Sequence, residues 1–346
     1  MFQDATPPSR SGPGSDPADR PGSRVGLTRR RFLASLGLVA GAGALLPAIH
    51  RARRGGPRRL EAGRLLMGTW VRVVVVDADE TRATRALERA FAAMREVDAQ
   101  MSIHREDTDL ARVNRAAGER AVRVAPAVVE VTASALDAAR RTGGVYDPTV
   151  LPLMRLYGFY GPARDTLPSA AEIDATLARM GHERVEVDRA ASTLALARPG
   201  MGLDLGSLGK GWAVDRAVAA LRAEGIRSAL VDAGGKVYGL GTPGDGGDGW
   251  SVGLFHPATG RCERVFALRD AAVGTSGNSE RYRTVAGHRL GHLFDARRGR
   301  PSEGHLSASV LARTAMEADR LCTVAFLVGP AAFRGWPGAL DTAFIG

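Results

Sequence analysis

Residues 203–211 read Leu-Asp-Leu-Gly-Ser-Leu-Gly-Lys-Gly and form a glycine-rich connector between an apolar segment and a predicted helix. Glycines at such a junction let backbone groups approach a phosphate closely, and the start of a helix and Lys210 add positive charge. The connector is not a Walker A loop, because its glycine spacing differs and no Ser or Thr follows the lysine. Taken alone, it fits a structural turn as well as a phosphate site.

The segments around this connector alternate between helical and strand patterns in no regular order. An amphipathic helix is predicted directly after it, from Gly211 to Glu224. Because strands and helices follow one another in mixed order, the sequence favours an α+β fold over a regular βαβ array. Short apolar and β-branched runs predict strands at residues 184–187, 193–197, 228–231 and 250–255.

The earlier part of the chain has the same mixed character. A β-branched run at residues 69–76 predicts a buried strand, and residues 80–101 have the apolar period of a helix. A second helix is predicted at 126–142, since it begins with a proline and two glycines follow it. A capping box at 169–172 begins a short helix that is predicted to reach Met180.

The best-defined helix runs from Thr314 to Val328, with Thr314 as its N-cap and Glu317 at the capping-box position. Asp319 and Thr323 are spaced i and i+4, so their side-chain oxygens share one face. A carboxylate and a hydroxyl form a plausible partial shell for Mg²⁺, which prefers oxygen ligands. An isolated pair of this kind is more often a surface aspartate and a threonine bonded to its own helix backbone.

His292 and Asp295 form a third candidate pair, in the segment Gly-His-Leu-Phe-Asp. A histidine with a carboxylate nearby can act as a general base on a hydroxyl group. A lone histidine is more often a structural residue with satisfied hydrogen bonds. The pair therefore does not identify a function by itself.

Eight short motifs, including the three above, follow one another in an order that resembles the successive motifs of the ApbE family. The resemblance covers roughly residues 63–346, and a chance agreement of eight ordered motifs is implausible. The motifs are Met67-Gly68-Thr69; Met101-Ser102 with Arg105; residues 144–150 with Pro152 and Gly158-Phe159; residues 203–211; Gly234-Gly235; Thr275-Ser276-Gly277 with Glu280-Arg281-Tyr282; His292 with Asp295; and Thr314-Ala315-Met316 with Asp319 and Thr323.

The resemblance implies a T-fold-like α+β domain, with mixed or antiparallel sheets flanked by helices, that binds FAD in a cleft. It also implies an enzyme, an FAD:protein FMN transferase that uses Mg²⁺ and attaches FMN to a threonine of an acceptor protein. A base would take the threonine proton, the threonine oxygen would attack the FMN phosphorus, and AMP would leave. The acceptor would be an electron-transfer flavoprotein subunit that carries the target threonine.

The same resemblance assigns roles to individual residues. His292 would be the catalytic base. The metal would be bound by Asp319, Thr323 and the backbone carbonyl of Gly209. The FAD site would include Met67, Gly68, Thr69, Met101, Ser102, Gly234 and Gly235, with Asp204 and Lys210 near the diphosphate or ribose.

The chain departs from the common family pattern at three places. His104 stands where many members carry an aromatic residue able to stack on the flavin. Lys236 follows the Gly-Gly pair where Asp or Asn is common, and residues 277–279 replace a more usual acidic-aromatic sequence. These departures bear on flavin affinity and acceptor preference more than on the predicted metal site.

Two other functions are compatible with the sequence. A Mg²⁺-dependent FAD pyrophosphatase needs the same cation and diphosphate geometry but lets water attack the phosphorus. The other is an extracytoplasmic flavin-binding protein without turnover, which missing metal ligands or a missing His292 would favour. Those residues are present.

The composition is that of an ordinary soluble globular protein, with 346 residues of which 45% are hydrophobic and 24% charged. The formal charge of +10 is concentrated at one end, since residues 1–60 hold 11 arginines against three aspartates. The basic character therefore belongs to the N-terminal leader, and no nucleic-acid partner is expected. The two cysteines, Cys262 and Cys322, are expected to be unpaired core residues.

Residues 1–50 are predicted to be a twin-arginine export signal. Thr-Arg-Arg-Arg-Phe-Leu at 28–33 leads into an apolar stretch at 32–49, which is a weak helix and short for a membrane span. Export to the periplasm or another extracytoplasmic space is expected, and both cleavage of the leader and its retention as a membrane anchor are open. Residues 51–62 are predicted to be a linker to the transferase-like domain at 63–346.

Overall fold

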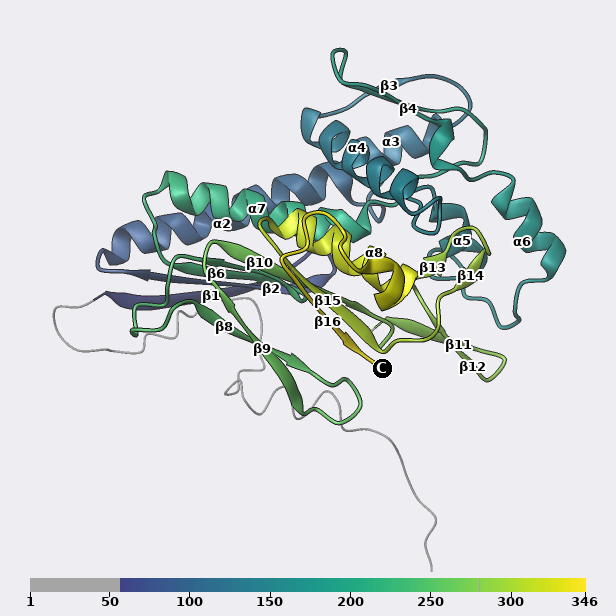
Figure 1. Cartoon of the computed structure of the whole chain (residues 1–346). Coiled ribbons are helices and arrows are strands. Elements are labelled where there is room, and N and C mark those ends of the chain that lie inside the picture. Colours follow the sequence, from purple (N-terminus) through teal and green to yellow (C-terminus); the bar gives the residue numbers. More distant parts are fainter. Residues whose placement is uncertain (1–56, 280) are drawn as a thin grey trace, which may run out of the picture. The chain divides into compact units, whose positions relative to one another are not determined.

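The computed structural model describes residues 57–279 and 281–346 (Figure 1). The predicted export signal at 1–50 and the first six residues of the predicted linker lie outside this part. The first strand, β1, spans Arg58–Leu66 and so begins inside the stretch predicted to be linker. Within the described ranges, no helix has the length and apolar character needed to cross a membrane.

A seven-stranded sheet in which every pairing is antiparallel forms the centre of the fold. Neighbouring strands are often distant in the chain, since β2 pairs with β6 and β10 lies between β7 and β15. The predicted α+β class with antiparallel sheets is confirmed. In spatial order the strands are β1, β2 (Thr69–Asp77), β6 (Ala229–Ala233), β7 (Lys236–Leu240), β10 (Ala271–Gly277), β15 (Ser307–Ala312) and β16 (Asp341–Ile345).

A tight two-residue turn joins β1 to β2. Met67 and Gly68 have positive φ angles of 51° and 70°, the backbone twist that favours two-residue hairpins. Leu66 pairs with Thr69 directly beside the turn. The strand predicted at 69–76 is therefore observed with nearly the same bounds.

Alternate residues of β2 point into two different cores. Val71, Val73 and Val75 are buried on the face that carries the long helices, while Val74 belongs to a second cluster. The helices are α2 (Glu80–Met101), α7 (Gly206–Ala223) and α8 (Ala315–Phe333), and the hairpin of β8 (Trp250–Phe255) and β9 (Cys262–Leu268) lies on the other side of the sheet (Figure 1).

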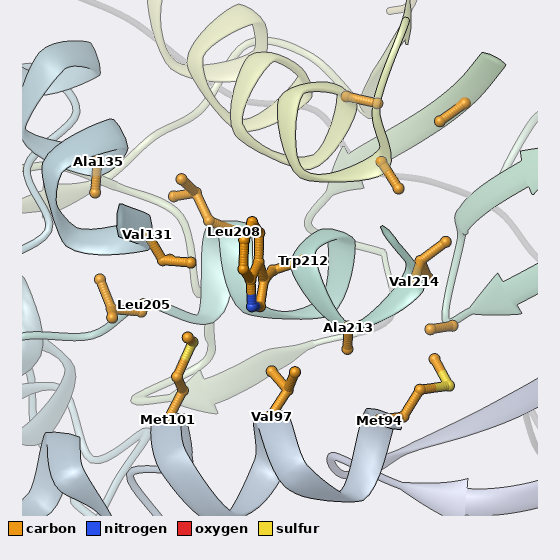
Figure 2. Close-up of a cluster of buried hydrophobic side chains, with 14 of the residues drawn as sticks. Met94, Val97, Met101, Val131, Ala135, Leu205, Leu208, Trp212, Ala213 and Val214 are labelled. Atoms are coloured by element: carbon orange, nitrogen blue, oxygen red, sulfur yellow. The ribbon is translucent and has the colours of Figure 1, made fainter. Parts of the chain in front are cut away.

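Helix α7 lies at the centre of the larger core. Figure 2 shows its Leu208 and Trp212 facing Val97 and Met101 of α2, with α4 (Pro126–Arg141) closing a third side. All four side chains are buried. Because burial of apolar area is the main favourable term in folding, this cluster holds α7 firmly in place.

Helix α8 lies very close to its neighbours because glycines face it. A Cβ on Gly211 of α7 would lie 2.6 Å from the carbonyl carbon of Ala315, and a Cβ on Gly274 of β10 would lie 2.7 Å from that of Ala318. Neither position could hold a larger residue without moving the helix. Asp215 of α7 fixes the start of α8, since its carboxylate accepts the first two N–H groups of the helix at 2.8 and 2.9 Å.

The predicted helix signals are observed at both capping sites. Thr314 Oγ1 accepts the N–H of Glu317 at 3.2 Å, and Gly329, with a φ angle of 77°, interrupts α8 near its predicted end. The capping box at 169–172 is formed at the start of α6 (Ala170–Leu177), which is shorter than predicted.

Smaller elements surround this framework. Strands β3, β5 and β4 form a three-stranded sheet, and β11–β12 and β13–β14 form separate pairs. The bounds are α3 (Asp109–Arg115), β3 (Val122–Arg123), α5 (Leu151–Leu156), η2 (His182–Arg184), β4 (Val185–Asp188), β5 (Thr193–Leu196), β11 (Tyr282–Val285), β12 (His288–Gly291), β13 (Phe294–Asp295) and β14 (Arg300–Pro301).

Both cysteines are free, as predicted, but only Cys322 is buried. Cys262 is exposed at the start of β9, where Phe266 and Leu268 are the buried residues of the strand. The prediction of a core position is therefore wrong for Cys262, because the buried part of β9 begins further along the strand.

Candidate active site

A buried carboxylate lies where α8, α7 and β7 meet. Asp319 is 1% exposed. Its Oδ2 accepts the N–H of Gly211 at 2.9 Å, and its Oδ1 lies 3.4 Å from Nζ of Lys236. This burial excludes the interpretation of Asp319 as a surface helix residue, and both of its oxygens face positively polarised partners.

Lys236 is the cation of this buried pair and reaches Asp319 from the first position of β7. Its ammonium also donates a hydrogen bond to the carbonyl of Thr275 and lies 3.7 Å from Sγ of Cys322. Burial acts to lower the pKa of Lys236, but its contacts with Cys322 and Asp319 raise it above the ordinary value of a lysine. The side chain is therefore a fixed positive charge.

Hydroxyl and thiol groups complete the surroundings of Asp319. Ser276 Oγ lies 3.0 Å from both Oγ1 of Thr323 and Sγ of Cys322. Thr323 Oγ1 donates to the carbonyl of Asp319 at 3.2 Å, so the threonine is bonded to its own helix. Burial raises the pKa of the Cys322 thiol, which keeps it protonated near neutral pH. The sequence placed Ser276 in a matched motif but indicated no role for it.

The glycine-rich connector continues directly into α7, which begins at Gly206 and not at Gly211 as predicted. Gly209, the predicted source of a metal-binding carbonyl, lies in the first turns of this helix, and its N–H donates to the carbonyl of Leu205 at 2.8 Å. Among the described residues, apart from its chain neighbours and the nearby backbone of its own helix, no heavy atom lies within 4 Å of the place that a Cβ on Gly209 would take. This side of the helix therefore faces open space, and Gly211 makes the contact to Asp319.

Lys210 adds a second cation on the same helix. Its Nζ donates to the carbonyl of Gly206 at 2.8 Å. Burial lowers the pKa of Lys210, while the charges of Asp319 and Asp204 act in the opposite direction. The start of α7 therefore combines a lysine, a carboxylate and an open glycine face.

Asp204 joins the connector to an aromatic cluster. Its Oδ1 accepts the N–H of Gly206 at 2.8 Å, and its Oδ2 accepts the hydroxyl of Tyr160 at 2.9 Å. The Tyr160 ring meets the His104 ring edge-on at 5.2 Å, and the guanidinium carbon of Arg281 lies 4.9 Å from its centre. Burial raises the pKa of the Tyr160 hydroxyl. The only sequence signal for Tyr160 was its place directly after a matched motif.

His292 lies between β12 and β13, and its Nδ1 is 3.0 Å from the carbonyl oxygen of Arg281. Since a carbonyl can only accept, Nδ1 carries the proton and Nε2 is unprotonated and keeps its lone pair. Burial lowers the pKa of His292 to about 3, and the charges of Arg281, Lys210 and Lys236 act in the same direction. The imidazole is therefore neutral near pH 7, and its electrostatic surroundings include both lysines of the Asp319 site.

Asp295, the carboxylate expected beside His292, is used in a turn. Its Oδ1 accepts the N–H groups of Arg297 and Arg298 at 3.0 and 3.3 Å, directly after β13. The group that orients the imidazole is thus the carbonyl of Arg281. A backbone partner of this kind has no sequence signal.

Two turns bring predicted flavin-site residues together at one end of the sheet. Met67 and Gly68 form the β1–β2 turn, and Gly234 and Gly235, with φ angles of 59° and 80°, form the β6–β7 turn. A Cβ on Gly234 would meet the side chain of Thr69, so the two turns adjoin. The second turn leads directly into β7 and the Asp319 site.

The other predicted flavin-site segment lies at the end of α2. Met101 is buried beside Leu208 and Trp212 in the core (Figure 2). Ser102 caps the helix, and its carbonyl accepts the hydroxyl of Thr108 at 2.8 Å. Met101 therefore has a packing role and Ser102 a capping role in this structure.

A surface cavity of about 590 Å³ lies elsewhere, and α4, β4 and α8 contribute to its walls. Three of its charged groups lie together, since Asp137 is within 4 Å of both Arg140 and Arg320. None of the predicted site residues lines it. The chemistry of the side chains, and not cavity size, therefore locates the candidate site.

Comparisons with known proteins identify the family of the chain. The ApbE family model matches residues 67–342. The chain is 34% identical over 272 residues to an FAD:protein FMN transferase of Klebsiella pneumoniae, covering 76% of this chain and 77% of the relative. It is 33% identical over 310 residues to an FAD:protein FMN transferase of Treponema pallidum, covering 83% and 84%.

Two solved structures have a similar fold. The ApbE protein of Thermotoga maritima has a TM-score of 0.74 at 29% identity, covering 83% of this chain and 94% of that one. The apo form of the Pseudomonas stutzeri flavinyl transferase ApbE has a TM-score of 0.75 at 26% identity, covering 85% and 92%.

Proposed function

The chain belongs to the ApbE family, and on this premise we propose that it is an FAD:protein FMN transferase. One observation carries the proposal: His292 is neutral, has an unprotonated Nε2, and lies in the field of three cations. A neutral base beside positive charge suits a reaction in which a hydroxyl loses its proton and attacks an anionic phosphate.

The proposed reaction moves one phosphoryl group. Nε2 of His292 takes the proton from a threonine hydroxyl of the acceptor protein, and the threonine oxygen forms a bond to the FMN phosphorus. The bond between that phosphorus and the bridging diphosphate oxygen breaks, and AMP leaves with the electron pair. Threonine is a poor nucleophile near neutral pH, so the base should contribute roughly 10² to 10⁴ in rate.

Two cations of this chain are suited to bind the diphosphate of FAD. Lys210 lies at the start of α7, and the Arg281 side chain stacks over Tyr160. Both would offset phosphate charge and stabilise the charge that develops on AMP. The open space beside Gly209 supports an approach of the diphosphate to this end of α7.

The surroundings of Asp319 do not suit the Mg²⁺ ion that the family resemblance implies. Asp319 and Thr323 offer oxygen atoms of the kind that Mg²⁺ prefers. However, the N–H of Gly211 and the ammonium of Lys236 already face the two carboxylate oxygens. A divalent ion on Oδ1 would lie next to a buried ammonium, so this arrangement does not fit the ion. The proposed steps therefore use no metal.

We further propose export by the twin-arginine route and an extracytoplasmic electron-transfer flavoprotein subunit as the acceptor. The first rests on the leader sequence, which lies outside the described residues, and the second on the family resemblance. An uncleaved leader would also attach the protein to the membrane.

Transfer can be tested directly, because it alone leaves flavin bound to protein. Purified protein, FAD and candidate acceptors would be incubated with Mg²⁺ and, in parallel, with a chelator. Flavin fluorescence of the acceptor after denaturing electrophoresis, and an FMN mass increment on a threonine peptide, are the expected results. Free FMN and AMP without a labelled acceptor would indicate a pyrophosphatase, and no AMP under either condition would indicate a flavin-binding protein without turnover.

A further inference from the structure

Lysine is rare in this chain, and both of its lysines lie at the candidate site. Of 47 Lys and Arg residues, only Lys210 and Lys236 are lysines. The two side chains differ, because the lysine ammonium is a compact charge with three donors, whereas the arginine guanidinium is a wide planar fork. A buried position that must hold a small cation is one that arginine cannot fill.

Lys236 occupies such a position. It is 4% exposed, and its ammonium faces three acceptors: the Asp319 carboxylate, the Thr275 carbonyl and the Cys322 sulfur. Three donors therefore meet three acceptors, so the group is satisfied where it lies. The set includes a carboxylate and a carbonyl, which are also the oxygen types that bind a metal cation.

Asp319 needs a positive partner because it is buried. A carboxylate that is removed from water without a counter-charge is strongly unfavourable. Lys236 provides that charge from within the chain, and the N–H of Gly211 satisfies the second oxygen. Both oxygens of Asp319 therefore have partners from within the chain, without a bound ligand.

We propose that the Lys236 ammonium takes the place of a divalent cation at Asp319, so that this site works without Mg²⁺. The inference rests on the proposed transferase function, because it concerns the charge balance of the same site. Lys236 acts through Asp319 and the elements that Asp319 joins, so it is a positioning residue. Its ammonium is part of the chain, whereas a bound metal would be exchangeable.

The matched pair of variants is Lys236→Asn and Lys210→Asn, since each removes one of the two lysines. In the wild type, the transfer rate should be the same in chelator and in Mg²⁺. Lys236→Asn leaves Asp319 without its counter-charge and opens the space beside it. That variant should lose about 10- to 100-fold in rate in chelator and recover with Mg²⁺. Lys210→Asn should be slow under both conditions.

Metal binding gives a readout that does not depend on activity. Electron paramagnetic resonance of Mn²⁺, titrated into each protein without FAD, should show one tight site in Lys236→Asn and none in the wild type or Lys210→Asn. Protein with ¹⁵N-labelled lysine offers a second readout, because its two lysines give two side-chain ammonium signals. The Lys236 signal of the wild type should not move when Mg²⁺ is added.

The outcomes separate this inference from the proposed function. Transfer that stops in chelator, together with a wild-type Mn²⁺ site and a Mg²⁺-dependent Lys236 signal, would overturn the inference and leave the transferase intact. Absence of acceptor labelling under all conditions would overturn the transferase, while the Mn²⁺ and lysine signals would still decide whether Lys236 replaces the cation. If Lys236→Asn fails to fold, the wild-type measurements alone give the same decision.

Discussion

A single added methyl group on Gly211 should displace the helix that carries Asp319. The new Cβ would lie 2.6 Å from the carbonyl carbon of Ala315 and 2.7 Å from Cα of Met316. Both are backbone atoms, so no side chain can rotate away. Because carbon atoms in contact are about 3.5 to 4.0 Å apart, α8 must move by about 1 Å relative to α7.

The expected loss of stability follows from two opposing terms. Overpacking costs typically about 1–3 kcal/mol, and the upper end applies here because the obstacle is backbone. Alanine is favoured over glycine within a helix by about 1 kcal/mol, so the net loss should be about 2 kcal/mol. For a domain of this size, each kcal/mol lowers Tm by about 2–4 °C, which predicts a fall of about 4–8 °C. A shift of about 1 Å can also slow transfer by about 100-fold.

Gly209→Ala is the matched control, because it adds the same methyl group two residues earlier on the same helix. Apart from its chain neighbours and the nearby backbone of α7, its Cβ would meet no atom within 4 Å among the described residues, so its Tm should be unchanged or slightly higher. Differential scanning calorimetry would compare the two variants, and the in-gel flavin assay would compare Gly211→Ala with the wild type. A Gly211→Ala protein as stable as Gly209→Ala would refute the close packing of α7 against α8.

The remaining predictions concern charge, catalysis and export. Asp319→Asn should lower the free energy of unfolding by about 3–5 kcal/mol, because it leaves Lys236 buried and unpaired, and adding Lys236→Met should restore most of the loss in urea titrations. His292→Asn should slow acceptor labelling by about 10²- to 10⁴-fold without changing FAD affinity, and equal rates would mean that another group is the base. Because the pKa of His292 is lowered to about 3, the base stays unprotonated from pH 8 down to 5, so a rate that halves near pH 6.5 would contradict this assignment. Replacement of Arg29 and Arg30 by lysine should keep the protein in the cytoplasm, and undiminished export on fractionation would exclude the twin-arginine route.

Helices with local signals could be predicted from the sequence, and several strands could not. Helix α2 has its predicted bounds, and the cap at Thr314 is observed, because apolar period and capping depend on nearby residues. Strand β10 was missed because it reads Ala-Ala-Val-Gly-Thr-Ser-Gly, with few β-branched residues. Its small side chains suit close contact with α8, which only the pairing of distant segments reveals.

Some residues of the candidate site could likewise be predicted from the sequence, and others could not. Sequence motifs identified His292, Asp319 and Lys210, which the structure brings into one electrostatic neighbourhood. Lys236 was recognised only as a departure from a family pattern, and Tyr160 was not recognised. Their partners are Asp319 and Asp204, far away in the chain, so these contacts depend on the completed fold.

The difference between the two free cysteines makes the natural chain suitable for site-specific labelling. A thiol-reactive dye should attach to the exposed Cys262 alone, because Cys322 is buried and its raised pKa keeps the sulfur in the unreactive thiol form. The dye would sit on the β8–β9 hairpin, on the side of the sheet away from the long helices. Energy transfer between this dye and a flavin could then report the arrival of FAD and the departure of a flavin-labelled acceptor during turnover, without any engineered substitution.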